Sequence, residues 1–153
     1  MNAGTLGGKT GSGDITLSGI GTVNVTGHIM TGTHLTAGGN GGSTTLDVFG
    51  TIDNGVVLAI ATSGASNLKN DGTATSTAAI SNNSTNQTLT IGSLGALTIN
   101  AAESITSGTI SMAGGTLTDS SGLTVGSGET LNGPGTVAAH RLISSHSREP
   151  FAN

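Results

Sequence analysis

The sequence of 153 residues contains no cysteine, and its only aromatic residues are Phe49 and Phe151. Without cysteine, disulfides cannot stabilise the fold. Large rings usually dominate the burial in a compact globular core, so their scarcity argues against such a core. A narrow interior filled by Leu, Ile and Val fits this composition better.

Charged residues are also scarce, at 8% of the chain, and the formal net charge is −4. The cations are Lys9, Lys69, Arg141 and Arg148, which leave no basic patch for nucleic acid. The longest apolar run, Val56–Ala61, is far too short to span a membrane. We therefore expect no nucleic-acid partner and no membrane span in this chain. No signal-peptide pattern follows Met1, so we expect any export signal to lie outside this sequence.

Glycine, threonine, serine and asparagine together make up more than half of the chain. Such bias often accompanies disorder, but disordered chains are usually poor in hydrophobic residues and rich in charge. Here hydrophobic residues reach 33%. The composition therefore favours an ordered chain, although one that is unusually rich in small polar residues and glycine.

Aliphatic residues recur in pairs two positions apart, followed within a few residues by Gly, Ser or Asn. The pairs are Ile15/Leu17, Val23/Val25, Leu46/Val48, Leu89/Ile91, Leu97/Ile99 and Leu123/Val125. On an extended backbone the two members of a pair point to the same side. Each strand is too short to bury its own apolar side, so it must stack on similar strands above and below it. The pattern predicts an all-β solenoid of about six irregular coils, with roughly 18–25 residues per coil.

The chain divides into three parts by composition. Residues 1–13 are interpreted as a loose N-terminal lead-in, residues 14–139 as the β-solenoid, and residues 140–153 as a non-repeat C-terminal tail. Within the solenoid, 61–87 is the weakest stretch, because its only large aliphatics are Leu68 and Ile80. It is either an excursion looped out of the stack or a poorly filled coil. The tail is either a cap or, as we favour, the end of an interrupted reading frame.

The clearest motif lies in Gly114–Ala139. Gly114-Gly115-Thr116-Leu117 is followed by the apolar strand Leu123-Thr124-Val125 and then by the ten residues from Gly128 to Val137, GETLNGPGTV. This order resembles the passenger-associated repeat of bacterial autotransporters. The resemblance implies a right-handed parallel β-helix that is secreted through a C-terminal membrane barrel and often used in adhesion. If this chain is exported, we expect its β-barrel translocator to be separate or missing. It carries over no functional residues, because the repeat is a structural motif.

Three features could carry catalysis or metal binding. Asp47 and Asp53 could present two carboxylates, as in polysaccharide-cleaving β-helices, but their positions fit turns and solvent-facing sites better. His28 and His34 could form a metal pair, but no cysteine or nearby acid completes it. The stretch Gly38–Ser43 is similar to a calcium-binding nonapeptide, but Ser43 replaces the required carboxylate.

Threonine pairs recur at Thr31/Thr33, Thr73/Thr75/Thr77, Thr88/Thr90 and Thr116/Thr118. Aligned on a regular solenoid, such pairs form the binding surface of some ice-binding proteins. The spacing between strand units varies from about six to twelve residues along this sequence. We therefore expect the threonines not to align.

The sequence thus predicts a structural or display fragment of a secreted bacterial surface protein, without catalysis and without catalytic, cofactor or metal sites. Its expected partners are host surface proteins or glycans, bound through weak multivalent contacts, and its expected location is extracellular or the bacterial cell surface. The alternatives are a free-standing binding module of the ice-binding or phage-fibre type and, third, a polysaccharide lyase.

Overall fold

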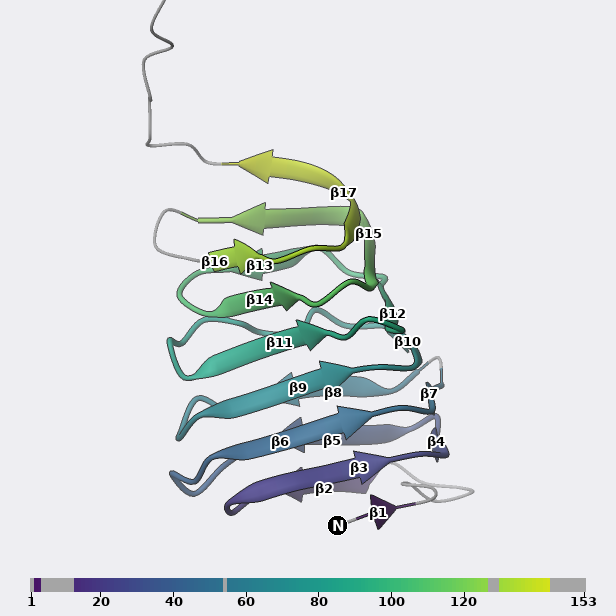
Figure 1. Cartoon of the computed structure of the whole chain (residues 1–153), viewed down its shortest axis with the longest axis vertical. Helices are drawn as coiled ribbons and strands as arrows, with labels where there is room; N and C mark the ends of the chain where they lie inside the picture. The colour runs from purple at the N-terminus through teal and green to yellow at the C-terminus, as the bar shows by residue number, and fades with distance from the viewer. Residues whose placement is uncertain (1, 4–12, 54, 127–129, 144–153) are drawn as a thin grey trace, which may run out of the picture.

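The computed structural model describes residues 2–3, 13–53, 55–126 and 130–143, and they form a parallel β-solenoid of about six coils (Figure 1). This confirms the predicted fold class. No helix occurs in these ranges, and accordingly none of the described residues forms a helix that could cross a membrane.

Each coil has three sides, which we call the first, second and third faces. The first face, toward the viewer in Figure 1, consists of β1 (Asn2–Ala3), β3 (Gly21–Val25), β6 (Thr44–Val48), β9 (Ser66–Asn70), β11 (Gln87–Ile91), β14 (Thr109–Met112) and β16 (Thr130–Asn132). The second face consists of β4 (His28–Ile29), β7 (Thr51–Ile52), β10 (Thr73–Ser76), β12 (Ala96–Ile99) and the first halves of β15 (Thr116–Val125) and β17 (Thr136–Ile143). The third face consists of β2 (Gly13–Leu17), β5 (Thr33–Ala37), β8 (Val57–Ile60), β13 (Glu103–Ile105) and the second halves of β15 and β17.

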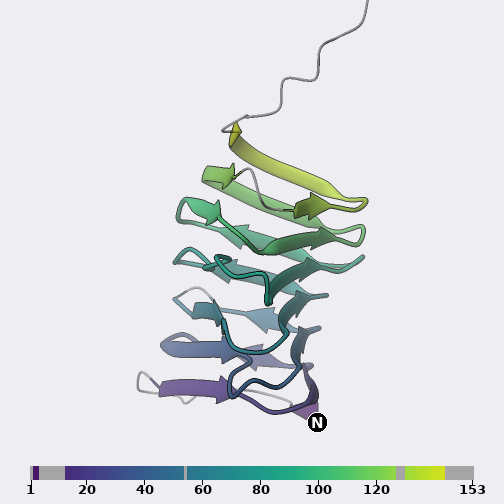
Figure 2. The same ribbon diagram turned by 90° about the vertical axis from the view of Figure 1, so that its left-hand side faces the viewer.

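Strands of successive coils lie one above the other (Figure 2). They pair in continuous register from coil to coil. One outward column of the first face contains Thr22, Thr45, Asn67, Thr88, Thr109 and Thr130. The coils on this face therefore advance by 21 to 23 residues each. The spacing between consecutive strands along the sequence varies because the corners within a coil differ in length. The spacing between equivalent strands of successive coils stays nearly constant.

The interior is a stack of aliphatic columns. On the first face, the residue that follows each member of the outward column along its strand points inward. These residues form the column Val23, Leu46, Leu68, Leu89, Ile110 and Leu131. The four central members of this column are at most 1% exposed. Leu123 and Val125 are likewise buried on the third face. Because each side chain packs on its equivalents one coil away, burial of apolar surface stabilises the stack along its whole length.

The stretch 61–87 lies within the stack. Its strands β9 and β10 are in register with β6 and β7 below and with β11 and β12 above. Where aliphatics are missing, buried amides and hydroxyls make hydrogen bonds to the backbone. Asn70 Nδ2 donates to the Gly72 carbonyl at 2.8 Å, and Gln87 Nε2 donates to the carbonyls of Ile60 and Ser81. The interior of this stretch is polar; its buried amide N–H groups are hydrogen-bonded, whereas the buried Oδ1 atoms of Asn70 and Asn82 have no partner among the described residues.

Both ends extend the solenoid beyond the boundaries that composition predicts. At the N-terminus, β1 pairs with Asn24 and Val25 of β3. At the C-terminus, β17 continues past Ala139, and Arg141–Ile143 pair with Leu123–Val125. Residues 4–12 of the predicted lead-in and 144–153 of the predicted tail lie outside the described residues.

Glycines line the sharp corner between the first and second faces. The column comprises Gly27, Gly50, Gly72, Gly95, Gly115 and Gly135. In several of these coils the corner glycine's carbonyl accepts a hydrogen bond from the first residue of the strand one coil above. Thr73 N–H, for example, donates to the Gly50 carbonyl at 3.1 Å. A Cβ on Gly72 would overlap the carbonyl oxygen of Gly50. The close backbone approach at this corner therefore requires glycine.

We predict that Gly72→Ala lowers the free energy of unfolding by about 1–3 kcal/mol, because the added methyl group meets backbone that cannot turn away. The neighbouring variant Thr73→Ala removes an exposed outer side chain and should change the free energy by less than about 0.5 kcal/mol. Urea unfolding followed by circular dichroism measures both variants. Equal stability of the two would show that the corner tolerates a side chain.

Candidate functional sites on and inside the solenoid

The two carboxylates singled out by the sequence lie on different faces. Asp47 projects from β6 on the first face, where its Oδ2 lies 3.0 Å from Lys69 Nζ. Asp53 follows β7 on the second face, and its Oδ1 lies 3.1 Å from His28 Nδ1. The structure therefore does not bring Asp47 and Asp53 together as an acid–base pair.

The two histidines are also separated. His28 begins β4 on the second face and pairs with Asp53, whereas His34 lies on the third face with its Nδ1 3.1 Å from Asp14 Oδ1. No group of three or more potential metal ligands occurs in the ranges that the structure describes. The two histidines form two separate exposed contacts with aspartates and not one metal pair.

The glycine-rich stretch at 38–43 forms the turn between β5 and β6. Gly38, Gly39, Asn40 and Gly41 all have positive φ angles, which glycine adopts readily and asparagine tolerates. The Asn40 side chain contacts the Ser18 hydroxyl one coil below, at 3.4 Å. The stretch reverses the chain direction, and no carboxylate lies within it.

A charged cluster that the sequence did not reveal joins two coils of the first face. Lys69 Nζ lies between Asp47 Oδ2, at 3.0 Å, and Asp71 Oδ2, at 2.5 Å. The Phe49 ring centroid is 5.7 Å from the same nitrogen. The hydrogen bond with Asp71 raises the pKa of Lys69; burial opposes this shift, and Asp47 adds to it. The lysine is thus held as an ammonium ion between two carboxylates.

This cluster has the residue types expected of a polysaccharide lyase, but the positive charge of its lysine is already balanced by two carboxylates. A lyase needs its cation free to stabilise the substrate carboxylate during proton abstraction. Here two aspartates occupy Lys69. The cluster became visible only in the structure, because Asp47 meets Lys69 through the coil register and not through proximity in sequence.

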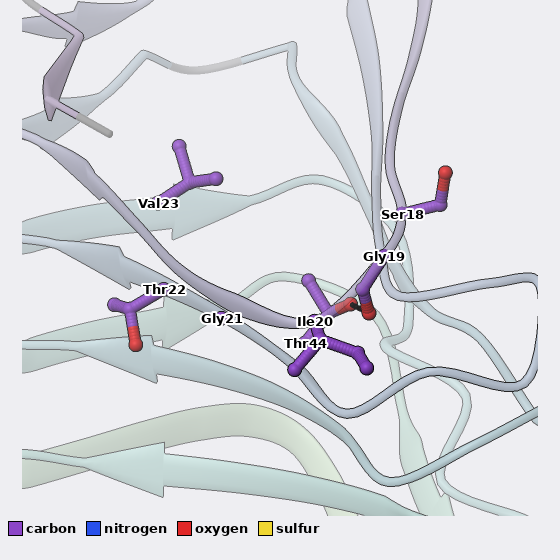
Figure 3. Close-up of a pocket in the computed structure, with 7 residues that line it drawn as sticks. All are labelled: Ser18, Gly19, Ile20, Gly21, Thr22, Val23 and Thr44. Atoms are coloured by element: carbon purple, nitrogen blue, oxygen red, sulfur yellow. Dashed lines mark hydrogen bonds between the residues drawn. The ribbon is translucent and has the colours of Figure 1, made fainter.

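A hollow of about 340 Å³ opens elsewhere, at the corner between β2 and β3 (Figure 3). Its lining residues are Ser18, Gly19, Ile20, Gly21, Thr22, Val23 and Thr44. The Thr44 hydroxyl donates to the Gly19 carbonyl at 2.7 Å, and Ile20 is 90% exposed beside it. None of the lining side chains is titratable, so they can supply neither an acid nor a base to a reaction in this hollow.

Two carboxylates are buried inside the upper half of the solenoid. Glu103 is 2% exposed and Asp119 is fully buried. Glu103 Oε2 accepts a hydrogen bond from the Ile80 N–H at 2.6 Å, and Asp119 Oδ2 accepts one from the Glu103 N–H at 3.1 Å. Asp119 Oδ1 also accepts from the N–H groups of the bend at 121–122. The two carboxylates thus satisfy backbone donors where regular pairing on the third face is interrupted.

Burial raises the pKa of Glu103 to about 7; the hydrogen bonds from Ile80 and Ser104 oppose the shift, and the nearby Asp119 charge adds to it. The alternation of inward and outward side chains along a strand could have identified Glu103 as a buried residue from the sequence. Glu103 precedes Ile105 by two positions and so shares its inward direction.

The second face carries an uncharged array of threonines across β10, β12 and β15. One column contains Thr73, Ala96 and Thr116, and the neighbouring column contains Thr75, Thr98 and Thr118. Within the described part of the chain, none of these five hydroxyls makes a hydrogen bond. The expectation that the threonines do not align is therefore wrong for Thr73/Thr75 and Thr116/Thr118, because equivalent strands keep a constant register although the corners vary in length. Thr33 and the pair Thr88/Thr90 lie on other faces and do not join this array.

Comparison with protein-family models, with curated proteins and with solved structures finds no match to this chain.

We predict that the free energy of unfolding depends on the ionisation of Glu103. Its pKa in the folded state, about 7, lies above the ordinary value of 4.5, so folding favours the protonated form. This contribution is complete below pH 4.5 and is lost as the pH rises through about 7, by about 2–3 kcal/mol. Glu103→Gln should remove this loss and be more stable than the wild type near pH 8.

Urea unfolding of both proteins near pH 5 and near pH 8 measures the effect. The difference between the two proteins isolates Glu103 from the other titrating groups. Parallel pH profiles would contradict the prediction.

Proposed function

We propose that this chain is a display segment of a bacterial surface protein of the autotransporter-passenger or adhesin type, and that it acts without catalysis. The observation that carries the proposal is the in-register array of polar side chains on the outer faces. Such columns present the same chemistry once per coil, at a spacing of about 4.8 Å.

The passenger-like motif supports the proposal, because it coincides with one complete coil. Gly114–Leu117 forms the corner and the start of β15 on the second face, and Leu123–Val125 forms the third face. Thr130–Asn132 is β16 on the first face, and Gly135–Val137 repeats the corner of the coil below. The resemblance thus concerns a whole structural unit, and with it we propose the right-handed helix of that family and export through a β-barrel translocator.

The distribution of charge supports a role without catalysis. Among the described residues, Lys69 is paired with two aspartates, and His28 and His34 each contact one. Catalytic sites gather ionisable groups in a concave pocket, but these contacts lie on three different faces. The partners we propose are host surface proteins or glycans, bound weakly at each coil and strongly only when many copies act together.

Dense display should therefore be necessary for binding. We predict that beads coated with this chain adhere to animal cells or glycan-coated surfaces, whereas the soluble monomer neither binds measurably nor competes. Beads coated with the double variant Thr88→Glu/Thr109→Glu, which changes only outward positions of the first face, serve as the matched control and should adhere less. Tight binding by the monomer, or depolymerisation of pectin, would refute the proposal.

A second candidate function is the binding of ice, and the aligned threonines of the second face favour it. Their methyl and hydroxyl groups repeat at about 4.8 Å between coils and about 6.7 Å along a strand. These distances resemble the oxygen spacings on the prism faces of hexagonal ice. A rigid, uncharged and regular surface suits a crystalline ligand better than a small solute.

We predict for this candidate that the chain inhibits ice recrystallisation and that Thr98→Lys, at the centre of the array, abolishes the effect. The matched variant Thr36→Lys, at an outward position of β5 on the third face, should retain it. The assay is the growth of ice crystals in a frozen sucrose film. Normal crystal growth with the wild type would exclude this candidate and leave the display proposal intact.

A further inference from the structure

The third face of the solenoid is interrupted between β8 and β13. Among the described strands, β8 pairs only with β5, and β13 pairs only with β15. The coil between them crosses this face with residues 77–86, which contain no strand and pair only through an isolated bridge from Asn82 to Ile105. We call residues 77–86 the strap. The ladder of backbone hydrogen bonds that joins the other coils is therefore largely missing where the strap crosses.

Two side chains take the place of this ladder. Gln87 Oε1 accepts hydrogen bonds from the N–H groups of Asn83 and Ser84, at 2.8 and 2.9 Å. From the coil above, Glu103 Oε2 accepts one from the N–H of Ile80, whose side chain is fully buried. Of the two accepting side chains, only Glu103 can change its charge with pH. The strap is thus attached at Ile80 by a titratable group.

Glu103 is buried without a cation to balance its charge. No ion pair among the described residues includes it. Its charged neighbour is Asp119 of β15, whose carboxylate accepts the Glu103 N–H. The strap and the strands β11 to β14 contain no other charged or titratable residue; on the far side of β15, β17 contains His140 and Arg141. Ionised Glu103 would therefore be a buried charge beside a like charge, which is unfavourable.

We propose that the strap is a pH-responsive segment, which stays closed while Glu103 is protonated and opens away from the third face when Glu103 ionises. Opening would hydrate the carboxylate at the cost of the Ile80 contact and a few hydrogen bonds, whereas unwinding a coil would break its ladders on the other faces as well. The coils above and below would therefore stay wound, and the upper edge of β8 would become accessible. This local opening is distinct from the change in the global free energy of unfolding predicted above, and it does not depend on the display function.

The direction of the response follows from the two states of the carboxyl group. Burial, with a smaller contribution from Asp119, raises the pKa of Glu103 to about 7 under the closed strap, whereas the hydrated group has the ordinary value of 4.5. The extra stability of the closed strap is complete below the lower value and is lost as the pH rises through the upper one. The equilibrium constant for opening should therefore rise by about 50- to 100-fold between pH 5 and pH 8.

Native-state amide hydrogen exchange of the full chain, corrected for the pH dependence of intrinsic exchange, measures this opening. Protection of the Ile80, Asn83 and Ser84 amides should fall by that factor between the two pH values, and low concentrations of urea should not change it. Glu103→Gln keeps an acceptor for the Ile80 N–H but cannot ionise, so its strap should be equally protected at both. Asp53→Asn, which removes a carboxylate of the second face, is the matched control and should behave like the wild type.

The amides of β9 and β11 on the first face distinguish local opening from global unfolding. They should exchange more slowly than the strap amides and should respond to urea. If the strap amides exchanged at the same rate as these, with the same urea dependence, the proposal would be wrong, although the prediction for the global free energy would stand. A Glu103→Gln variant that kept the wild-type pH dependence would overturn the proposal as well.

A cysteine probe tests the same opening at a side chain, since the chain contains no other cysteine. Ile80→Cys and Ile91→Cys each place a thiol at a fully buried position, the first in the strap and the second in β11. Rates of alkylation by iodoacetamide are compared with those of the unfolded chain at the same pH, which removes the effect of thiol ionisation. Only the strap thiol should become more reactive at pH 8 than at pH 5. Equal protection of the two thiols at both pH values would contradict a local opening.

Discussion

The close stacking of backbone at the corner between the first and second faces is the constraint on which the rest of the solenoid depends. At this corner Gly72 lies so near the Gly50 carbonyl that no side chain fits between them. The hydrogen bond from Thr73 N–H to that carbonyl fixes where the next strand begins. Once the corner is fixed in each coil, the in-and-out alternation of the following strand is fixed too. The columns of the interior and of the outer faces are consequences of this register.

The interior of the solenoid accommodates buried polar residues among its aliphatic columns. Aliphatic columns supply most of the burial, but the coil containing β9 and β10 holds Asn70, Ser76 and Asn82 inside, and Gln87 is buried at the start of β11 in the next coil. Each donates a hydrogen bond to a backbone carbonyl. Further along the chain, Glu103 accepts a bond from the Ile80 N–H and Asp119 accepts one from the Glu103 N–H, and each donor lies one coil below its acceptor. Polar residues are thus tolerated wherever the winding of the chain leaves backbone groups unpaired.

The sequence was sufficient to predict the class of fold and the number of coils, because aliphatic pairs such as Leu46/Val48 and Leu123/Val125 indicate short strands with one buried side. It did not reveal the regular advance per coil, since corner lengths vary and hide the recurring Gly-Thr-aliphatic pattern at Gly50 and Gly72. The Lys69 cluster and the threonine array escaped prediction for the same reason. Both depend on contacts between coils, which only the register defines.

The buried polar coil has a consequence for how the rod comes apart. In a solenoid, stability is close to a sum of terms for each coil and each interface between neighbours. The coil that holds Asn70 and Asn82 inside has weaker interfaces above and below it than an all-aliphatic coil would have, since hydrogen bonds contribute less net stability than apolar burial. The column of Leu46, Leu68 and Leu89 nevertheless continues through it. Under mechanical load, we expect the solenoid to extend at this coil first, while the coils on either side stay folded.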